Sequence, residues 1–230
     1  MDFTRRAQQS ELMDDETLTP AVFHAVLSDL AQVNIVTRAA APTLHWLARA
    51  AQGRSHVTVL DVGFGHGDML RRIAHWARAR RLAVTLIGID RDPRSAAIAT
   101  AATDPALGIS YHTGDAASLA MQPDCIISSL VAHHMRDEEL VDFLRWMDDT
   151  ATRGWFINDL HRHRLAWLGY RALAALARWH PIVQHDGALS VRRAFTRADW
   201  DRLLAAAGLT QPPVWVRWHL PFRWGVGCIR

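Results

Sequence analysis

The sequence predicts an α/β fold built on a mostly parallel β-sheet with helices on both faces. From residue 57 to residue 158, runs rich in β-branched residues alternate with helical patterns, which is typical of repeated strand–helix–strand units. One run, Cys125-Ile126-Ile127, is continuously apolar, as expected for a strand buried on both faces of such a sheet. With 230 residues, the chain can form one substantial core and a small appended part.

The first 52 residues are predicted to form a helical cap. Thr19 suits an N-cap and Pro20 the first helical position, and apolar residues recur at helical spacing after them. A second helix is expected to begin near Pro42. We therefore divide the chain into an N-terminal helical cap, residues 1–52, and a core domain, residues 53–230.

The core domain begins with regular alternation. Apolar residues at every second position indicate strands, and apolar residues three and four positions apart indicate helices. The expected elements are, in order, a strand at 57–62, a helix at 68–81, a strand at 84–89, a helix at 94–102, strands at 108–112 and 124–129, a helix from Asp137 and a strand at 155–158.

The second half of the core departs from this alternation. Residues 161–180 read as one long, apolar helix dotted with arginines. A further helix is predicted at 196–207, where Thr196 suits an N-cap. The tail is predicted to form two strands joined through Pro221.

The composition restricts the class of protein. Half of the residues are hydrophobic and 21% are charged, as in soluble globular proteins. Cys125 and Cys228 form neither a disulfide framework nor a metal-site spacing, which favours a reducing cytoplasm. No apolar run reaches the roughly 18 residues of a membrane span, and the first residues lack the apolar centre of a signal peptide. We expect a cytoplasmic protein.

All 26 basic residues are arginines, and the formal net charge is only +3. The absence of lysine excludes chemistry that needs a lysine Schiff base or a lysine general base. The arginines are scattered along the chain rather than clustered, so no nucleic-acid partner is expected.

A loop with three glycines follows the first strand, in the stretch V-L-D-V-G-F-G-H-G-D. Gly63, Gly65 and Gly67 allow a tight turn and leave no side chain between the backbone and a ligand. A helix follows at once, and the amide groups at a helix start bind polar or negative groups. The spacing G-x-G-x-G, with Asp61 two residues before the first glycine, differs from the dinucleotide pattern G-x-G-x-x-G.

Acidic residues end the next two strands. Asp90 closes the second strand, in L-I-G-I-D-R, where a carboxylate can accept hydrogen bonds from both ribose hydroxyls. Asp115 lies just past the third strand, in H-T-G-D-A, where it can accept a hydrogen bond from an adenine amino group. The fourth strand, D-C-I-I-S-S-L, opens into a polar loop. Together these positions predict a nucleoside-containing ligand.

In the order and spacing of these four motifs, the chain resembles the class I S-adenosylmethionine-dependent methyltransferases over roughly residues 55–230. The resemblance implies a Rossmann-like, seven-stranded sheet whose last two strands form an antiparallel hairpin. It implies S-adenosylmethionine as the cofactor, with the glycines at its methionine part, Asp90 at the ribose, Asp115 at the adenine and Asp61 below the loop. The implied cofactor-binding residues in the motifs are Asp61, Gly63, Gly65, Gly67, Asp90, Arg91, Asp115, Ala116 and Ser129.

More narrowly, the chain is similar to small-molecule methyltransferases related to quinone-biosynthesis enzymes, some of which accompany type III polyketide synthases. The supporting stretches are E-L-M-D-D, Q-V-N-I-V-T-R-A-A, S-S-L-V-A-H-H-M, F-I-N-D-L-H-R-H and D-G-A-L-S-V-R-R-A-F-T. This resemblance implies secondary metabolism and a small aromatic or polyketide-derived acceptor. The long segment after Asp159 departs from simpler relatives, so residues 161–195 are expected to be a lid or an acceptor-pocket insertion, with a plain packed helix as the alternative.

Two histidines are candidates for catalysis. His133 and His134 directly follow the fourth strand, at the sheet edge where such folds bind ligands. An acceptor hydroxyl must lose a proton during methyl transfer, and an imidazole can take it at neutral pH. We favour His134 as the base, and the alternative is that one histidine only packs. His161 and His163 could bind the acceptor or a metal, but a metal site would need a third ligand, so no metal is expected.

Arg38 is a candidate partner for the methionine carboxylate of the cofactor. It lies in the helical cap, which covers the cofactor in this architecture, and a guanidinium pairs well with a carboxylate. The alternative is that Arg38 belongs to a solvated helix face.

The predicted function is O-methylation of a small acceptor by in-line displacement, with a histidine as general base. Three alternatives stay open: C-methylation of a quinone-like ring, nucleic-acid methylation and a non-catalytic cofactor-binding role. The exit of the fourth strand lacks the N/D-P-P-Y/F/W signature of exocyclic amine methylation, which counts against many nucleic-acid enzymes. The expected partner is a small molecule, and the oligomeric state stays open, a homodimer included.

Overall fold

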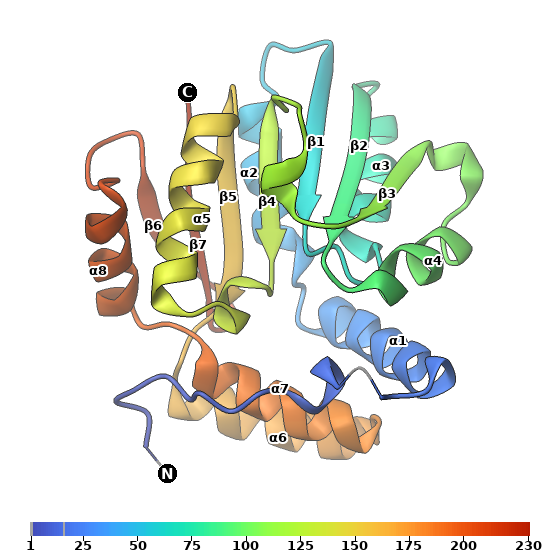
Figure 1. Ribbon diagram of the computed structural model, residues 1–230, viewed down its shortest axis with the longest axis vertical. Helices are drawn as coiled ribbons and strands as arrows, with labels where there is room; N and C mark the ends of the chain where they lie inside the picture. The colour runs from blue at the N-terminus through green and yellow to red at the C-terminus, as the bar shows by residue number, and fades with distance from the viewer. Residues whose placement is uncertain (1, 16) are drawn as a thin grey trace.

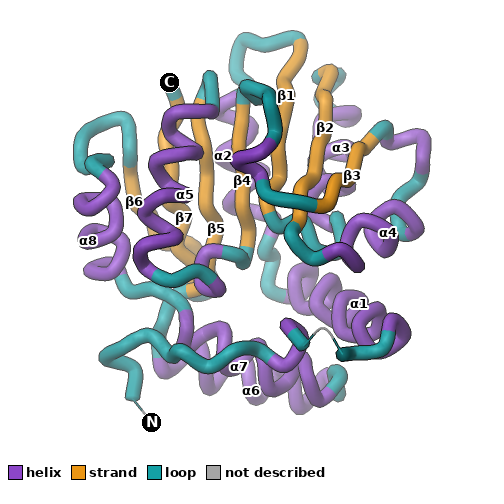
Figure 2. The backbone as a smooth tube through the Cα atoms, viewed as in Figure 1, coloured by secondary structure: helices purple, strands orange, loops and turns teal. Residues whose placement is uncertain are grey.

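The fold is centred on one seven-stranded sheet in the order β3-β2-β1-β4-β5-β7-β6. The computed structural model describes residues 2–15 and 17–230. Five neighbouring strands are parallel, and β7 runs antiparallel to both β5 and β6 (Figures 1 and 2). The predicted fold class, including the antiparallel hairpin through Pro221, is therefore confirmed. The strands are β1 (His56–Val62), β2 (Ala83–Asp90), β3 (Ile109–Thr113), β4 (Cys125–Ser129), β5 (Gly154–Leu160), β6 (Trp215–His219) and β7 (Arg223–Ile229).

Helices cover both faces of the sheet, as the alternating pattern predicts. Helices α5 (Asp137–Thr150) and α8 (Arg197–Ala207) pack on one face through Leu144 and Trp200, which are fully buried. The opposite face is covered by α2, α3 and α4 (Figure 1). In α3 the buried residues recur every three or four positions, so that one stripe faces the strands. The bounds of these three helices are α2 (Ala40–Ala50), α3 (Asp68–Ala79) and α4 (Pro93–Ala101).

A third group of helices lies below the carboxyl ends of the parallel strands (Figure 1). It consists of α1 (Pro20–Val36), α6 (Arg164–Ala177) and α7 (Pro181–Arg193). The short 3₁₀ helix η1 (Leu12–Asp14) packs against α7. These helices have their own small apolar core, formed by Val26, Val33, Ala174, Trp179 and Val183. The group therefore forms the floor beneath the sheet edge at which ligands are expected.

The helical segment 1–52 is shared between two parts of the structure. Its helix α1 packs with α7, whereas α2 packs on the sheet, where the Trp46 ring stacks on Phe156 with centroids 5.5 Å apart. Trp46 is 2% exposed because it fills the space between α2 and the strands. Residue 52 thus does not separate a cap from a core in the packing, since only the part before α2 lies over the sheet edge.

The helix predicted over 161–180 forms as α6 but is shorter at both ends, Arg164–Ala177. It ends at this point because Arg178 adopts a left-handed backbone with φ of 55°. The His180 side chain then caps α7, with Pro181 at its first position. Helix α7 was not predicted, since its buried residues are spread among charged and small ones.

Three short 3₁₀ helices follow strands or lead into them. They are η2 (Pro105–Leu107), η3 (Ala116–Ser118) and η4 (Ala132–His134). Of these, η4 carries both candidate catalytic histidines away from the end of β4. Among the helices of residues 2–15 and 17–230, none combines the length and apolarity that crossing a bilayer requires.

Candidate functional site

Two adjoining cavities lie along the carboxyl ends of the parallel strands. The first, of about 320 Å³, lies between the glycine loop and the helices α1 and α7. The second, of about 550 Å³, lies between the ends of β2 and β3 and helix α5. Gly63, Asp90, Val131 and His134 line both cavities. One elongated ligand can therefore occupy both.

The glycine loop has a left-handed backbone at all three glycines, with φ of 76°, 52° and 75° at Gly63, Gly65 and Gly67. A Cβ on Gly63 would approach Val131 Cγ2 to 2.4 Å, and one on Gly67 would approach Tyr111 Oη to 2.5 Å. A Cβ on Gly65 would meet open space. Gly63 and Gly65 line the first cavity, but Gly67 lines neither and instead starts α3.

Asp61 is a buried carboxyl with an unsatisfied oxygen. The residue is 1% exposed, lines the first cavity, and its Oδ1 has no hydrogen-bond partner among the described residues. Burial raises the pKa of Asp61 well above its usual range, and the nearby charges of Asp68 and Asp90 raise it further. A bound ammonium group would supply the missing partner, so this position fits the amino group of S-adenosylmethionine.

Asp90 lies where the two cavities meet. Its Oδ1 accepts a hydrogen bond from the Asp92 amide and its Oδ2 one from the Gly65 amide, both at 2.9 Å. Burial raises the pKa of Asp90, although these two amides act in the opposite direction. Each oxygen keeps a further lone pair, so the fixed carboxylate can accept two hydroxyl hydrogen bonds. This geometry fits a ribose that joins two parts of one ligand.

The predicted adenine-binding residues line the second cavity. Arg91 Nη2 lies 2.7 Å from Asp115 Oδ2, and Ala116 is buried beside them. The hydrogen bond from the Ala117 amide lowers the pKa of Asp115, as does Arg91. These side chains therefore form a polar wall beyond Asp90.

The last two predicted cofactor residues lie apart from that wall. Ser129 lines the first cavity, where its Oγ lies 3.4 Å from Thr43 Oγ1. Arg38 is exposed, follows the end of α1 and lines neither cavity. The structure thus brings the predicted cofactor residues together, except Gly67 and Arg38.

His133 is held by a buried carboxylate. Its Nδ1 lies 2.7 Å from Asp159 Oδ1, and its backbone amide donates to Asp159 Oδ2 at 3.0 Å. Burial acts to raise the pKa of Asp159, but the charge and hydrogen bond of His133 lower it overall. Donation from Nδ1–H to Asp159 leaves Nε2 as the proton acceptor of the neutral ring. No role was predicted for Asp159 from the sequence.

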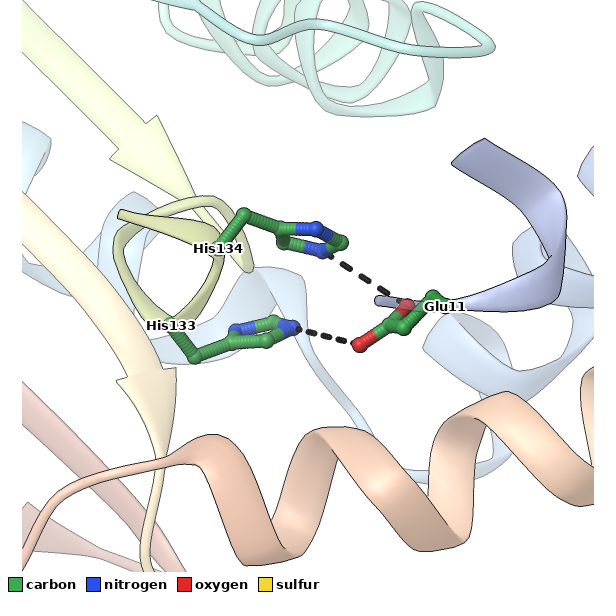
Figure 3. Close-up of side chains that lie close together, drawn as sticks. All are labelled: Glu11, His133 and His134. Carbon is green, nitrogen blue, oxygen red and sulfur yellow. Dashed lines mark ion pairs between the residues drawn. The ribbon is translucent and has the colours of Figure 1, made fainter. Parts of the chain in front are cut away.

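The Glu11 carboxylate points at both histidine rings from one side (Figure 3). Its Oε1 is 3.7 Å from His133 Nε2, and its Oε2 is 3.6 Å from His134 Nε2. The Ser190 hydroxyl donates to Oε1 at 2.7 Å, and burial raises the pKa of Glu11. His134 itself is partly exposed and lines both cavities. The sequence motif E-L-M-D-D contains Glu11, but nothing in its local pattern assigns it to this site.

The described residues contain one set of side chains arranged to hold a metal ion. Ligand atoms of Glu11, His133 and His134 lie within 4.8 Å of one another. In contrast, His161 and His163 lie in an aromatic cluster and line neither cavity. Burial lowers the pKa of His161 to about 4, and the charges of His163 and Arg162 add to this effect. The suggestion that this second pair binds the acceptor thus gains no support.

Residues 59–154 match a protein family described as "Methyltransferase domain". This segment contains most of β1, the glycine loop, β2, β3, β4 and α5, so it includes most of the predicted cofactor residues. The chain is an S-adenosylmethionine-dependent methyltransferase, and its fold is that of the class I enzymes.

Solved structures with the same fold include three that cover most of this chain. Magnesium protoporphyrin IX methyltransferase of Synechocystis PCC 6803 with bound SAH has 17% identity and a TM-score of 0.56, covering 95% of this chain and 91% of that chain. The plantazolicin methyltransferase BamL, with a desmethyl plantazolicin analogue and SAH, has 15% identity and a TM-score of 0.62, and the match covers 83% of this chain and 70% of that chain. A SAM-dependent methyltransferase of Aquifex aeolicus has 14% identity and a TM-score of 0.60, and the match covers 93% of this chain and 99% of that chain. No curated protein sequence matches this chain significantly.

Proposed function

We propose that this methyltransferase methylates a hydroxyl oxygen of a small aromatic or polyketide-derived acceptor. The first cavity supports this proposal, because it is lined by apolar side chains from α1 and α7 and by polar ones from the sheet edge. Leu27, Leu30 and Val191 are among these apolar walls, and they suit a hydrocarbon or aromatic body. Two of the similar structures are methyltransferases named for a porphyrin and for the natural product plantazolicin, which are small molecules.

The cofactor is proposed to extend through both cavities. Asp61, Gly63 and Gly65 would hold its methionine part, and Asp90 its ribose. Arg91, Asp115 and Ala116 would enclose the adenine, with Ser129 beside the methionine part. Bound there, S-adenosylmethionine supplies an electrophilic methyl group on a sulfonium. The chain's own task is to hold the acceptor oxygen in line with that group and to exclude water.

The hydrogen-bonded pair of Asp159 and His133 carries the proposal of a general base. Nε2 of His133, which lies 3.7 Å from Glu11 Oε1, would accept the proton of the acceptor hydroxyl, and Asp159 would stabilise the imidazolium that results. We therefore assign the base to His133 and not to His134, which the sequence favoured. His134 lies where both cavities meet, so we assign it to holding the acceptor against the cofactor.

Product analysis tests this function. The purified protein is incubated with methyl-labelled S-adenosylmethionine and a panel of phenols and polyketide pyrones, and the label is followed into the products. We expect an O-methyl product that acid dealkylation releases, and a label that resists dealkylation would indicate C-methylation instead. The variant His133→Ala should form little product while binding S-adenosylhomocysteine like the wild type. Full turnover by this variant would refute the assigned base.

A further inference from the structure

Arg223 begins β7 and is the one arginine that lines the first cavity among the described residues. Its side chain is buried, with 2% of the residue exposed. Nη2 donates a hydrogen bond to Thr37 Oγ1 at 3.0 Å. Nε and Nη1 have no hydrogen-bond partner among the described residues. The cavity therefore has a guanidinium with unpaired donors in its wall.

A buried cation without a counterion is unfavourable, because the water it loses is not replaced. Burial lowers the pKa of Arg223 to about 10, while the charge of Asp159 acts in the opposite direction. The guanidinium thus stays charged at neutral pH, and among the described side chains only the neutral Thr37 hydroxyl accepts a hydrogen bond from it. A group with these properties is suited to an anionic partner that binds in the cavity.

The position of Arg223 in the sheet indicates which ligand supplies that partner. It lies opposite Leu160 of β5, and the sheet order from the glycine loop outward is β1-β4-β5-β7. With strands about 4.8 Å apart, its backbone is about 14 Å from β1. Asp90 and Asp115 lie on the other side of β1, on β2 and after β3. Arg223 is thus at the end of the cavity farthest from the sugar and base of the proposed cofactor.

We propose that Arg223 binds an anionic oxygen of the acceptor, a carboxylate or an acidic phenolate, so that the acceptors are aromatic or polyketide acids. This inference rests on the proposed function, because it places the acceptor beyond the reacting methyl group. The other charged groups that line the cavity are acids, which repel an anion unless Arg223 attracts it. These acids are Glu11, Asp14, Asp61, Asp68, Asp90 and Asp92.

Calorimetric titration of the protein saturated with S-adenosylhomocysteine tests the proposal. The probes are salicylate and hydroxynaphthoate, each compared with its amide of the same shape, salicylamide or hydroxynaphthamide. We expect the wild type to bind each acid about tenfold or more tightly than its amide, since hydrogen bonds to charged groups are the stronger ones. Arg223→Met should abolish this preference. The control Arg217→Met, at an exposed arginine of β6, should keep it.

Equal binding of acid and amide, no binding of any acid, or an acid preference retained by Arg223→Met would overturn the proposal. A second measurement separates the two sources of a carboxylate. If Arg223→Met weakens binding of S-adenosylhomocysteine but not of methylthioadenosine, Arg223 pairs with the cofactor's carboxylate and the acceptor assignment fails. Since all these are binding measurements, a lack of methyl transfer would refute the proposed function and leave the Arg223 result intact.

The melting temperature of the unliganded variant checks whether Arg223 has only a structural role. Methionine has a similar length and carries no charge, so Arg223→Met should melt at the same temperature as the wild type or higher. A large drop in melting temperature would mean that the arginine supports the fold, and would count against the proposal.

Discussion

The carboxylate of Asp159 accepts two hydrogen bonds from His133, one from the ring Nδ1 at 2.7 Å and one from the backbone amide at 3.0 Å. His133 lies in η4, which follows β4, and Asp159 lies in β5, which pairs with β4 in the sheet. The side chain and the main chain of the proposed base are thus fixed by one fully buried group. This arrangement sets the ring tautomer before any acceptor binds.

Replacing Asp159 with Asn should lower turnover by about 100-fold or more, which is the typical contribution of general-base catalysis. The amide of Asn can donate to Nδ1 and so place the ring proton on Nε2, where the base is needed. Steady-state kinetics at saturating cofactor will measure the loss. Binding of S-adenosylhomocysteine should stay unchanged, as it should in the control Asp149→Asn at an exposed position of α5. Wild-type turnover in Asp159→Asn would exclude the carboxylate from the reaction.

Replacing Asp90 with Ala should weaken cofactor binding by about 1–3 kcal/mol, because hydrogen bonds to a charged acceptor are lost. Calorimetry with S-adenosylhomocysteine will measure the change. The matched control is Asp104→Ala, which removes an exposed aspartate after α4 and should leave the affinity unchanged. Unaltered affinity in Asp90→Ala would remove Asp90 from the ribose site.

Asp61 should make the stability of the unliganded protein depend on pH. Its pKa is raised in the folded state, so the folded protein binds the proton more tightly than the unfolded chain. Its contribution to stability is therefore fully present below the unfolded pKa, near 3.8, and is lost as the pH rises through the folded pKa. Asp61→Asn should reduce this loss, so it should raise the melting temperature at neutral pH relative to the wild type. The same variant should bind S-adenosylhomocysteine more weakly, and a stable variant with full affinity would contradict the ammonium assignment.

Removal of metal ions should leave methyl transfer intact. The proton acceptor in our proposal is His133 with Asp159 behind it, and this pair functions without a cation. Activity after dialysis against a chelator should therefore equal that of the untreated protein. Loss of activity that zinc or manganese restores would instead assign Glu11, His133 and His134 to a metal site.

Trp46→Ala should destabilise the protein by about 3–5 kcal/mol, as is usual when a buried aromatic side chain is removed. The ring stacks on Phe156, and its Nε1 donates to the Cys228 carbonyl at 3.3 Å. Chemical denaturation will measure the difference, with Leu176→Ala as control, since Leu176 is 82% exposed on α6. A small effect of Trp46→Ala would mean that α2 contributes little to the sheet layer.

The sequence predicts well those parts of the molecule whose structure depends on residues close together in the chain. Gly63 and Asp90 are examples, because a glycine turn after a strand and an acid at a strand end are local patterns that fix a position in a parallel sheet. Arg38 was predicted to face the cofactor, but the direction of a residue after a helix end depends on how that helix packs. Arg38 adopts a left-handed backbone there and faces solvent.

Glu11 and Arg223 could not be assigned from the sequence for a different reason. Their contacts join segments that are far apart in the chain: Glu11 contacts η4 and α7, and Arg223 contacts the residue after α1. No spacing rule relates such positions, and an acid or an arginine is most often a surface residue. The supporting motifs E-L-M-D-D and S-V-R-R-A-F-T nevertheless meet in space, since the Ser190 hydroxyl donates to Glu11 Oε1 at 2.7 Å.

The first cavity takes wall residues from η1 and from the start of β7, which are among the earliest and latest parts of the sequence. During synthesis on a ribosome, the glycine loop and the strands around it emerge well before Arg223. The nascent chain can thus form the nucleoside-binding cavity first, while the first cavity beside it stays open to water. The wall of this cavity is complete only when β7 has been synthesised. Incomplete chains should therefore be unable to transfer the methyl group.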